Sequence, residues 1–368
     1  MRRYRRPSDG RHGLTLRAAR DQNRRLGDPA RDRGRSGTKR FQLRSARRAV
    51  AARPPLVVVA DPIDPGALRR LGEGPCRVED ATAGASALEP HLGEAWALIV
   101  RSRTHVTAEV IARAPVLKLI ARAGVGVDNV DVDAAAARGI QVVNAPTAAT
   151  NSVAELTVAF LLLLSRELYP QIEQTKRGSW KKGSNRAELR GKTVGFIGYG
   201  RVAREVAHLL DPFDVVTLAF DPFVPESKDR TEMVSLDAVL KRADFVSLHA
   251  ALTPENRHLI DRERLRLMRP SAFVINVARG PLVDEAALLE ALDAGRIAGA
   301  ALDVFEVEPP NRPKLLAHPK VIATPHLGAS TVEAQGRAGS HVVDEILRAL
   351  AGKPLTSLVK PAAAGGAS

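Results

Sequence analysis

The sequence is poor in cysteine, aromatic residues and long apolar runs, and these shortages exclude several classes of protein. Cys76 is the only cysteine in 368 residues, so the chain can form neither an intrachain disulfide nor a cysteine-rich metal cage. The longest uninterrupted apolar run, residues 158–164, is far shorter than the ~20 residues that span a bilayer. With 45% hydrophobic and 26% charged residues, the composition is that of a soluble globular protein of one large or two smaller domains. We expect a cytoplasmic protein without a membrane span or a metal site.

The excess of positive charge is confined to the first fifty residues. Residues 1–50 hold 17 of the 55 Lys and Arg residues and only 4 Asp, so they carry nearly all of the formal net charge of +14. The body is almost neutral, which gives no support for nucleic-acid binding by it. Because residues 1–52 are also poor in large apolar side chains, we expect a disordered basic tail. A nucleic-acid arm, a transit peptide and a segment without function are the alternatives, and the last is favoured, with a true start near Val50.

Two successive series of short apolar runs alternate with helical segments. The expected strands are 56–59, 97–100, 117–120 and 141–143, followed by 193–197, 215–220, 245–248, 272–276, 298–304 and 321–324. Such alternation is typical of parallel sheets covered by helices on both faces. Between the two series, Ser152 and Glu155 are spaced as a capping box and predict a buried apolar helix from residue 152 to about 168. The fold class is therefore α/β, with two doubly wound parallel-sheet domains.

A dinucleotide-binding motif stands at the start of the second series. The expected strand 193–197 leads into Gly198-Tyr-Gly200-Arg-Val-Ala203 and a helix, which is the G-x-G-x-x-A pattern in its required context. Gly198 permits the tight turn, and Gly200 lets the backbone approach a pyrophosphate at the helix N-terminus. Asp221, at the end of the next strand, would accept hydrogen bonds from ribose hydroxyls and repel a 2′-phosphate. We therefore predict NAD as the cofactor.

Chemically active side chains follow the later strands of the same series. Arg279 follows strand 272–276, Glu306 and Glu308 follow strand 298–304, and His326 follows strand 321–324. Because ligands of doubly wound sheets bind beyond the carboxyl ends of the strands, these groups should gather around the cofactor. A base, a carboxylate that orients it and an arginine suit hydride chemistry on a hydroxy acid. His249 and His258 are the competing histidines.

The motifs resemble those of the D-isomer-specific 2-hydroxyacid dehydrogenase family, most closely its members that oxidise phosphoglycerate. The resemblance runs from about residue 55 to 360. Its matching segments are 101–104, 122–131, 144–146, 198–200, 276–280, 301–309 and 325–331. It implies oxidation of D-3-phosphoglycerate to 3-phosphohydroxypyruvate, as in serine biosynthesis, with catalytic His326, Glu308 and Arg279. It also implies a homodimer, or a higher homo-oligomer, built partly on the helix from Ser152.

The resemblance further implies a division of the chain and a set of binding residues. A substrate-binding domain would cover 53–149, a flavodoxin-like fold, and a Rossmann-type NAD domain 150–329. Residues 330–360 would return to the first domain, and 361–368 would form a tail. Besides Gly198, Gly200 and Asp221, the cofactor would contact Arg201, Val202, Ala250, Val277, Ala278, Asp303 and Gly328. Asp303 would bond the nicotinamide carboxamide.

A small anionic 2-hydroxy acid is the expected partner. Two arginines after strand 97–100 and a glycine-rich nest after strand 117–120 would suit a phosphate plus a carboxylate. Trp180-Lys-Lys182 resembles a segment that reaches the phosphate of the neighbouring subunit. The expected substrate-binding residues are Arg101, Arg103, Gly124, Val125, Gly126 and Lys182.

Three departures from the family pattern and two alternative functions remain open. The chain ends at Ser368, so we expect a short form without a C-terminal regulatory domain and without serine feedback. Ala203 replaces a common glycine, and Val125 and Ala250 replace hydroxyl-bearing residues near the cofactor. A glyoxylate/hydroxypyruvate reductase or another D-2-hydroxyacid dehydrogenase is the first alternative. A non-enzymatic, NAD-sensing module like the C-terminal-binding-protein corepressors is the second.

Overall fold

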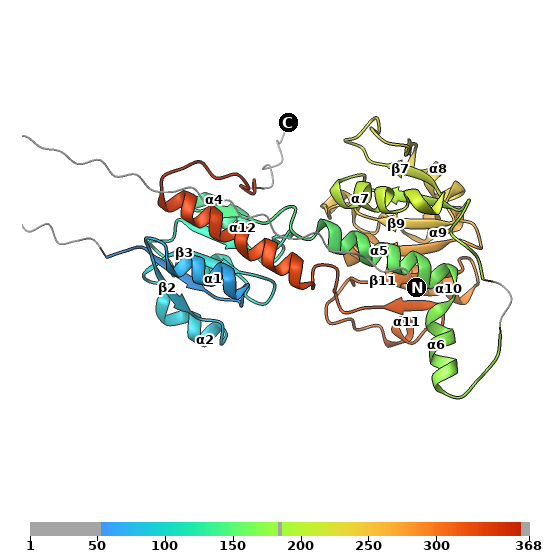
Figure 1. Cartoon of the computed structure of the whole chain (residues 1–368), viewed down its shortest axis with the longest axis horizontal. Coiled ribbons are helices and arrows are strands. Elements are labelled where there is room, and N and C mark those ends of the chain that lie inside the picture. The colour runs from blue at the N-terminus through green and yellow to red at the C-terminus, as the bar shows by residue number, and fades with distance from the viewer. Residues whose placement is uncertain (1–52, 183–185, 362–368) are drawn as a thin grey trace, which may run out of the picture. The chain divides into compact units, whose positions relative to one another are not determined.

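The computed structural model describes residues 53–182 and 186–361 (Figure 1). The predicted basic tail (1–52) and the end of the C-terminal tail (362–368) lie outside the described residues. Within the described ranges, no helix is long and apolar enough to cross a membrane.

The first sheet consists of five parallel strands in the order β2-β1-β3-β4-β5. Its strands are β1 (Leu56–Val59), β2 (Arg77–Asp80), β3 (Ala95–Val100), β4 (Leu119–Arg122) and β5 (Gln141–Val143). The connecting helices are α1 (Pro65–Gly72), α2 (Ala85–Leu88), η1 (Glu89–His91), α3 (Ala108–Ala112) and α4 (Val132–Ala137). This is the flavodoxin-like strand order, which has its switch point between β1 and β3.

The second sheet consists of seven parallel strands in the order β12-β11-β10-β9-β6-β7-β8. Its strands are β6 (Thr193–Ile197), β7 (Val216–Phe220), β8 (Glu232–Met233), β9 (Phe245–Leu248), β10 (Phe273–Asn276), β11 (Gly299–Leu302) and β12 (Val321–Ala323). The connecting helices are α7 (Arg201–Leu209), η2 (Asp211–Phe213), α8 (Leu236–Arg242), η3 (Pro254–Asn256), α9 (Arg262–Leu267), η4 (Gly280–Leu282), α10 (Glu285–Asp293) and α11 (Pro313–Leu316). The strand order reverses between the parallel neighbours β6 and β9, and this switch point places a ligand crevice at the carboxyl ends of these two strands. The predicted fold class is confirmed.

The helix that links the two series begins earlier than its capping box predicts. Helix α5 (Thr150–Ser165) has Ala149 at its N-cap, and no side chain caps it. Ser152 lies inside the helix and its hydroxyl is 2.8 Å from the hydroxyl of Thr331. The predicted N-cap at Ser152 is therefore wrong, because this hydroxyl bonds to a distant segment instead of its own helix. Helix α5 lies beside α7, and α6 (Leu168–Lys176) follows it (Figure 1).

The long helix α12 (Val332–Leu350) packs on the first sheet and lies beside α1 (Figure 1). Val342 and Ile346 are fully buried in a cluster that also contains Val57 of β1. A Cβ on Gly339 would lie only 3.2 Å from the Cβ of Ala67, so a small residue here allows the two helices to approach closely. The exact domain limits stay a prediction.

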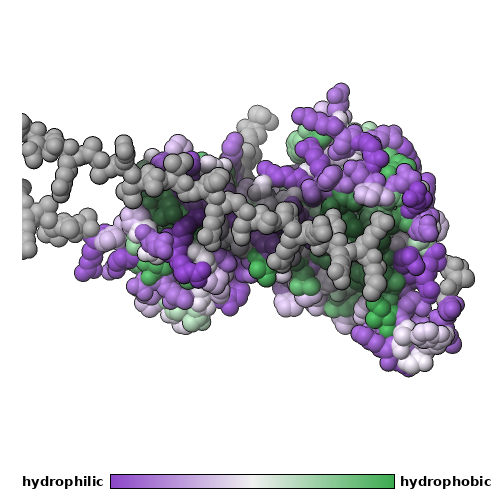
Figure 2. Space-filling model, viewed as in Figure 1, coloured by the Kyte–Doolittle hydropathy of each residue, from purple (hydrophilic) through white to green (hydrophobic). Residues whose placement is uncertain are grey.

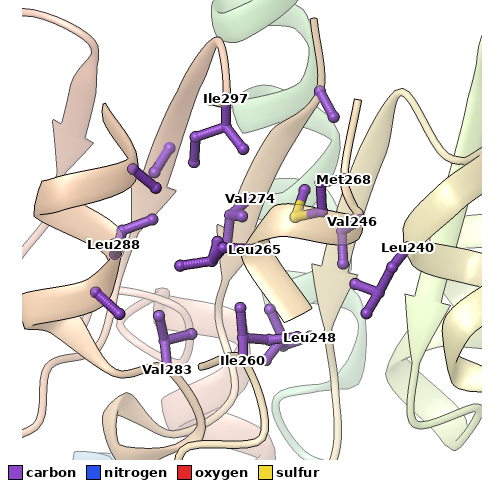
Figure 3. Packing of buried hydrophobic residues seen from close by; sticks show 14 of the residues in the cluster. Leu240, Val246, Leu248, Ile260, Leu265, Met268, Val274, Val283, Leu288 and Ile297 are labelled. Atoms are coloured by element: carbon purple, nitrogen blue, oxygen red, sulfur yellow. The ribbon is translucent and has the colours of Figure 1, made fainter. Parts of the chain in front are cut away.

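Apolar side chains of both sheets fill separate cores. Figure 3 shows one of them, in which Leu240, Leu265 and Leu288 from three helices pack around Val246 of β9 and Val274 of β10. Each such side chain contributes about 1.5–3 kcal/mol when fully buried. Hydrophilic residues dominate the visible surface, with smaller hydrophobic patches among them (Figure 2). The rigid sheets therefore present their polar strand ends as fixed positions.

Candidate active site

The glycine-rich turn between β6 and α7 has the shape that a dinucleotide needs. Gly198 has a φ of +86°, and a Cβ there would lie 2.6 Å from the amide nitrogen of Ala250. The backbone after β9 therefore crosses directly over this glycine. Gly200 is the N-cap of α7, and a Cβ on it would meet nothing within 4 Å. The space before the helix N-terminus is open, which fits an anionic pyrophosphate.

Asp221 holds the same turn from the end of the neighbouring strand β7. One carboxylate oxygen, Oδ2, accepts a hydrogen bond from the amide of Tyr199 at 2.8 Å, and Oδ1 accepts one from the amide of Phe223 at 2.9 Å. The side chain is only half-buried. Its remaining lone pairs can accept ribose hydroxyls, as the sequence predicts for NAD.

His326 and Glu308 form a hydrogen-bonded pair. The Nδ1 atom of His326 is 2.7 Å from Oε2 of Glu308, and Oε1 of Glu308 accepts a hydrogen bond from the amide of Phe305. The imidazole is half exposed. A carboxylate beside Nδ1 places the imidazole proton there and leaves Nε2 free to accept another. The pair can therefore act as a general base.

Asp303 shapes the loop that carries His326. Its buried carboxylate accepts hydrogen bonds from the Thr324 hydroxyl (2.6 Å) and from the amides of Leu327 (2.7 Å) and Gly328 (2.8 Å). These bonds hold the backbone before and after His326. They stabilise its φ of +53°, a conformation that few residues other than glycine adopt. Asp303 thus stabilises the His326 loop, a role separate from its predicted contact with the nicotinamide carboxamide.

Three arginines, Arg101, Arg122 and Arg279, lie close enough to repel one another. Arg279 follows β10, and its Nη2 is 3.1 Å from Oδ2 of Asp128. Arg122 ends β4, and burial lowers its pKa, as do the positive charges of Arg279 and Arg101. The Nε of Arg122 is buried and has no hydrogen-bond partner within the described residues. An anion would relieve both the repulsion and the missing bond.

Arg101, Arg122, Glu308 and His326 line a cavity of about 580 Å³, a size suited to a small ligand, whereas the predicted catalytic Arg279 is not among its lining residues. The residues around it come from the first sheet, from the loops of Glu308 and His326, and from the start of α12. They include Arg101, Ser102, Arg122, Gly124, Phe305, Glu308, His326 and Ser330. The predicted general base, its carboxylate and two cationic groups thus face one space.

Arg122 lines the cavity but is not among the predicted site residues. It is the last residue of strand β4, and the carboxyl end of a parallel strand is a position where ligands bind. That position in the matching segment 122–131 is the sequence signal for Arg122.

Some predicted substrate residues do not join the cavity. The guanidinium of Arg103 donates to the carbonyl of Thr82 at 2.9 Å and lies 3.6 Å from Asp61, beside a different cavity of about 490 Å³. Val125 and Lys182 are exposed and do not line the 580 Å³ cavity.

Gly126 has another role, because a Cβ there would lie 2.1 Å from Nη2 of Arg279. Its absence of a side chain makes room for that guanidinium.

The competing histidines have other environments. His249 is half-buried, its ring is 2.9 Å from the Ser247 hydroxyl, and desolvation lowers its pKa to about 3. Its imidazole is therefore neutral. His258 lies 3.3 Å from Glu306, away from the cavity.

The remaining predicted cofactor residues lie around the same strand ends. Arg201 and Val202 begin α7, Val277 and Ala278 follow β10, and Gly328 follows His326. Within the described ranges, no group of three metal-ligating side chains is found.

Comparison with known proteins identifies the family of the chain. Residues 158–328 match the model of the D-isomer specific 2-hydroxyacid dehydrogenase, NAD binding domain. A D-3-phosphoglycerate dehydrogenase of Mycobacterium tuberculosis is 45% identical over 311 residues, which cover 81% of this chain and 57% of that protein. This chain thus spans a little over half the length of that relative.

Two further matches extend over nearly their whole length. A hydroxypyruvate reductase of Thermotoga maritima is 42% identical over 299 residues, or 80% of this chain and 98% of that protein. The crystal structure of an NAD-dependent formate dehydrogenase from Staphylococcus aureus in complex with NAD superposes with a TM-score of 0.73 at 30% identity, covering 83% of this chain and 99% of the other.

Proposed function

Because the chain belongs to the D-isomer specific 2-hydroxyacid dehydrogenase family, an NAD-binding family of oxidoreductases, we propose that it oxidises D-3-phosphoglycerate to 3-phosphohydroxypyruvate. The observation that carries the proposal is the His326–Glu308 pair at the wall of a cavity that Arg101 and Arg122 also line. A base and an anion site in one small space are what oxidation of an anionic hydroxy acid requires.

The residues around the glycine-rich turn fit NAD. The open N-terminus of α7 would hold the pyrophosphate, and Asp221 would accept the ribose hydroxyls. When bound there, NAD supplies the acceptor for the hydride that leaves C2 of the substrate.

His326 takes the proton of the substrate hydroxyl on Nε2 as the C2 carbonyl forms. Glu308 keeps the ring oriented through Nδ1 and stabilises the imidazolium that results. In the reverse direction the same nitrogen returns the proton to the oxygen. The general base contributes roughly 10²–10⁴-fold to the rate.

The arginines bind and orient the substrate's anionic groups. Arg122 has an unbonded, buried Nε and Arg101 lies on the same wall, so a carboxylate or phosphate would find charge-assisted donors on both. Arg279, held by Asp128, adds positive charge beside them and polarises the substrate oxygen in this proposal.

Reduction of hydroxypyruvate is the second candidate. It is favoured by the position of Arg103, which pairs with Asp61 and leaves the cavity with fewer cations for a second anionic group. The hydroxypyruvate reductase relative, matched over 98% of its length, also supports it.

A homodimer and a cytoplasmic location complete the proposal. The exposed apolar side chains of Leu168, Tyr169 and Ile172 lie on α6, which follows the expected interface helix. Exposed apolar groups at this spacing suit burial against a second copy. Sedimentation of the purified protein measures the mass, and a monomer at micromolar concentration would contradict the dimer.

Steady-state turnover decides among the functions. The purified chain is assayed with NAD and D-3-phosphoglycerate or D-glycerate, and with NADH and hydroxypyruvate. With NAD we expect a higher kcat/KM for D-3-phosphoglycerate than for D-glycerate; the opposite order would favour the hydroxypyruvate reductase. No turnover with any 2-hydroxy acid, together with measurable NAD binding, would favour the sensing module.

The variant His326→Asn tests the mechanism. It should lose at least about 10²-fold in kcat while the Kd for NADH changes less than about twofold. Wild-type-like turnover by this variant would refute the assignment of the base. His318→Asn, at a histidine beside Asp293, is the matched control and should leave kcat unchanged.

A further inference from the structure

Two acidic residues with no place in the proposed reaction lie directly behind the segment that carries Glu308. Glu285 begins α10 and is 3% exposed, and the side chain of Glu306 is 14% exposed. Buried carboxylates are costly unless they are hydrogen-bonded or paired. Both carboxylates therefore need hydrogen-bond or ion-pair partners.

The two residues hold each other through their backbones. The amide of Glu306 donates to Oε1 of Glu285 at 2.6 Å, and the amide of Glu285 donates to Oε1 of Glu306 at 2.9 Å. Each carboxylate thus satisfies the other residue's N–H. We call this reciprocal pair the Glu285–Glu306 clasp. It joins two segments that are 21 residues apart.

Two arginines and a histidine lie beside the carboxylate oxygens that the clasp leaves free. The second oxygen of Glu285 is 3.3 Å from Nε of Arg312, and the second oxygen of Glu306 is 3.3 Å from Nε2 of His258 and 3.8 Å from Arg257. Burial and the charge of Glu306 raise the pKa of Glu285. Each carboxylate therefore has a backbone N–H and a basic side chain as partners, so the two acids form a satisfied polar network inside the fold.

The clasp is continuous with the catalytic groups. Next to Glu306, the amide of Phe305 donates to Oε1 of Glu308, whose other oxygen meets His326. On the opposite side, a Cβ on Gly280 would lie 1.8 Å from the carbonyl carbon of Phe305. The backbone of residues 305–306 is therefore held between the clasp and the turn that follows Arg279.

From this juxtaposition we infer that the Glu285–Glu306 clasp positions the 305–308 segment, and through it holds the Glu308 carboxylate on the imidazole of His326. The clasp residues are positioning residues, since neither touches the cavity. The inference rests on the proposed function only for its kinetic readout. Misplacing a catalytic group by about 1 Å costs on the order of 100-fold in rate, so a loosened segment should be visible in kcat.

The experiment compares Glu306→Ala with Glu306→Gln. The amide oxygen of the glutamine can still accept from the amide of Glu285, so Glu306→Gln should keep at least about a third of the wild-type kcat. Glu306→Ala removes the acceptor and should lower kcat about 10- to 100-fold while the KM for NAD stays within about twofold. The matched control is Glu290→Ala, an exposed acid on α10 that pairs with Arg262.

A double-mutant cycle shows whether the effect passes through Glu308. In a Glu308→Gln background, Glu306→Ala should cost less than about threefold in kcat, because the contact it supports is already altered. An equal loss in both backgrounds, or a loss in Glu290→Ala of the same size, would overturn the inference.

A readout without turnover separates failure of the clasp from failure of the proposed function. The Nδ1 proton of His326, followed by ¹⁵N NMR in the full chain, should show the hydrogen-bonded signal in the wild type and in Glu306→Gln and lose it in Glu306→Ala. An unchanged signal in Glu306→Ala refutes the clasp even if the wild type turns over no hydroxy acid. Should Glu306→Ala fail to fold, Arg312→Ala, which removes one compensating cation, is measured in the same way, and an unchanged Nδ1 signal and kcat there would refute the inference as well.

Discussion

The hydroxyl of Tyr199 should make the stability of the protein depend on pH in the alkaline range. Tyr199 stands between the two glycines of the cofactor turn and is fully buried. Its hydroxyl lies 2.7 and 2.8 Å from the carboxylate oxygens of Asp229 and 2.6 Å from the Thr231 hydroxyl. Burial, together with the Asp229 charge, raises the pKa of Tyr199 to about 12.

The sign and size of the effect follow from linkage. A folded-state pKa above the unfolded value of about 10 means that the native state keeps its proton while the unfolded state loses it. The contribution is complete below pH 10 and is lost as the pH rises through about 12. Between pH 9 and pH 11 the free energy of unfolding should therefore fall by about 1.4 kcal/mol on account of this group.

Urea unfolding of the wild type and of Tyr199→Phe at pH 8, 9, 10 and 11 measures this contribution. The variant should be less stable at pH 8 by about 1–3 kcal/mol, since Asp229 and Thr231 each lose one hydrogen-bond partner. It should also lose about 1.4 kcal/mol less than the wild type between pH 9 and 11. Equal losses in the two proteins would refute the reasoning. Tyr169→Phe, at an exposed tyrosine, is the control and should leave the slope unchanged.

Three further predictions concern the cofactor turn and the loop of the base. Asp221→Ala should reduce the preference for NAD over NADP by at least about 10-fold, measured as the ratio of Kd values; an unchanged ratio would contradict the role of the carboxylate. Gly198→Ala should abolish NAD binding and lower the Tm, because its Cβ would meet the Ala250 backbone at 2.6 Å, whereas Gly200→Ser should bind NAD more weakly with a nearly unchanged Tm. Asp303→Ala, which leaves two loop amides without their acceptor, should destabilise the protein by about 2–4 kcal/mol in urea unfolding and lower kcat; a variant as stable as the wild type would show that the loop keeps its shape without the carboxylate.

Much of the fold could be predicted from sequence because its strands are fully buried apolar runs. Strand β6 and strand β9 begin and end where the hydrophobic pattern begins and ends. Strand β2 was missed because Arg77-Val-Glu-Asp80 is an edge strand whose side chains are half or fully exposed, so it carries no apolar signal. Its place comes from pairing with β1 alone.

Site residues were predictable where chain position alone fixes them, and not where side-chain direction decides. His326 and Glu308 lie in the loops that follow the neighbouring parallel strands β12 and β11, so the topology brings these two loops to the same edge of the sheet. Arg103, only two residues beyond Arg101, pairs with Asp61 and lines another cavity, whereas Arg101 lines the 580 Å³ cavity. Spacing in a loop has no fixed period, so the sequence could not distinguish the two arginines.

The same type of contact holds three of the loops that face the proposed ligands. A carboxylate accepts backbone amide protons from the loop: Asp61 from the loop of Arg101, Asp221 from the glycine-rich turn, and Asp303 from the loop of His326. Charge-assisted bonds of this kind are about twice as strong as neutral ones, and backbone amides fix the course of the chain and not only one side chain. Loops held in this way keep their geometry before a ligand arrives, so less binding energy is spent on ordering them. Loss of any one carboxylate should therefore reduce affinity or rate through the loop it holds, and leave the sheets, whose cores it does not enter, folded.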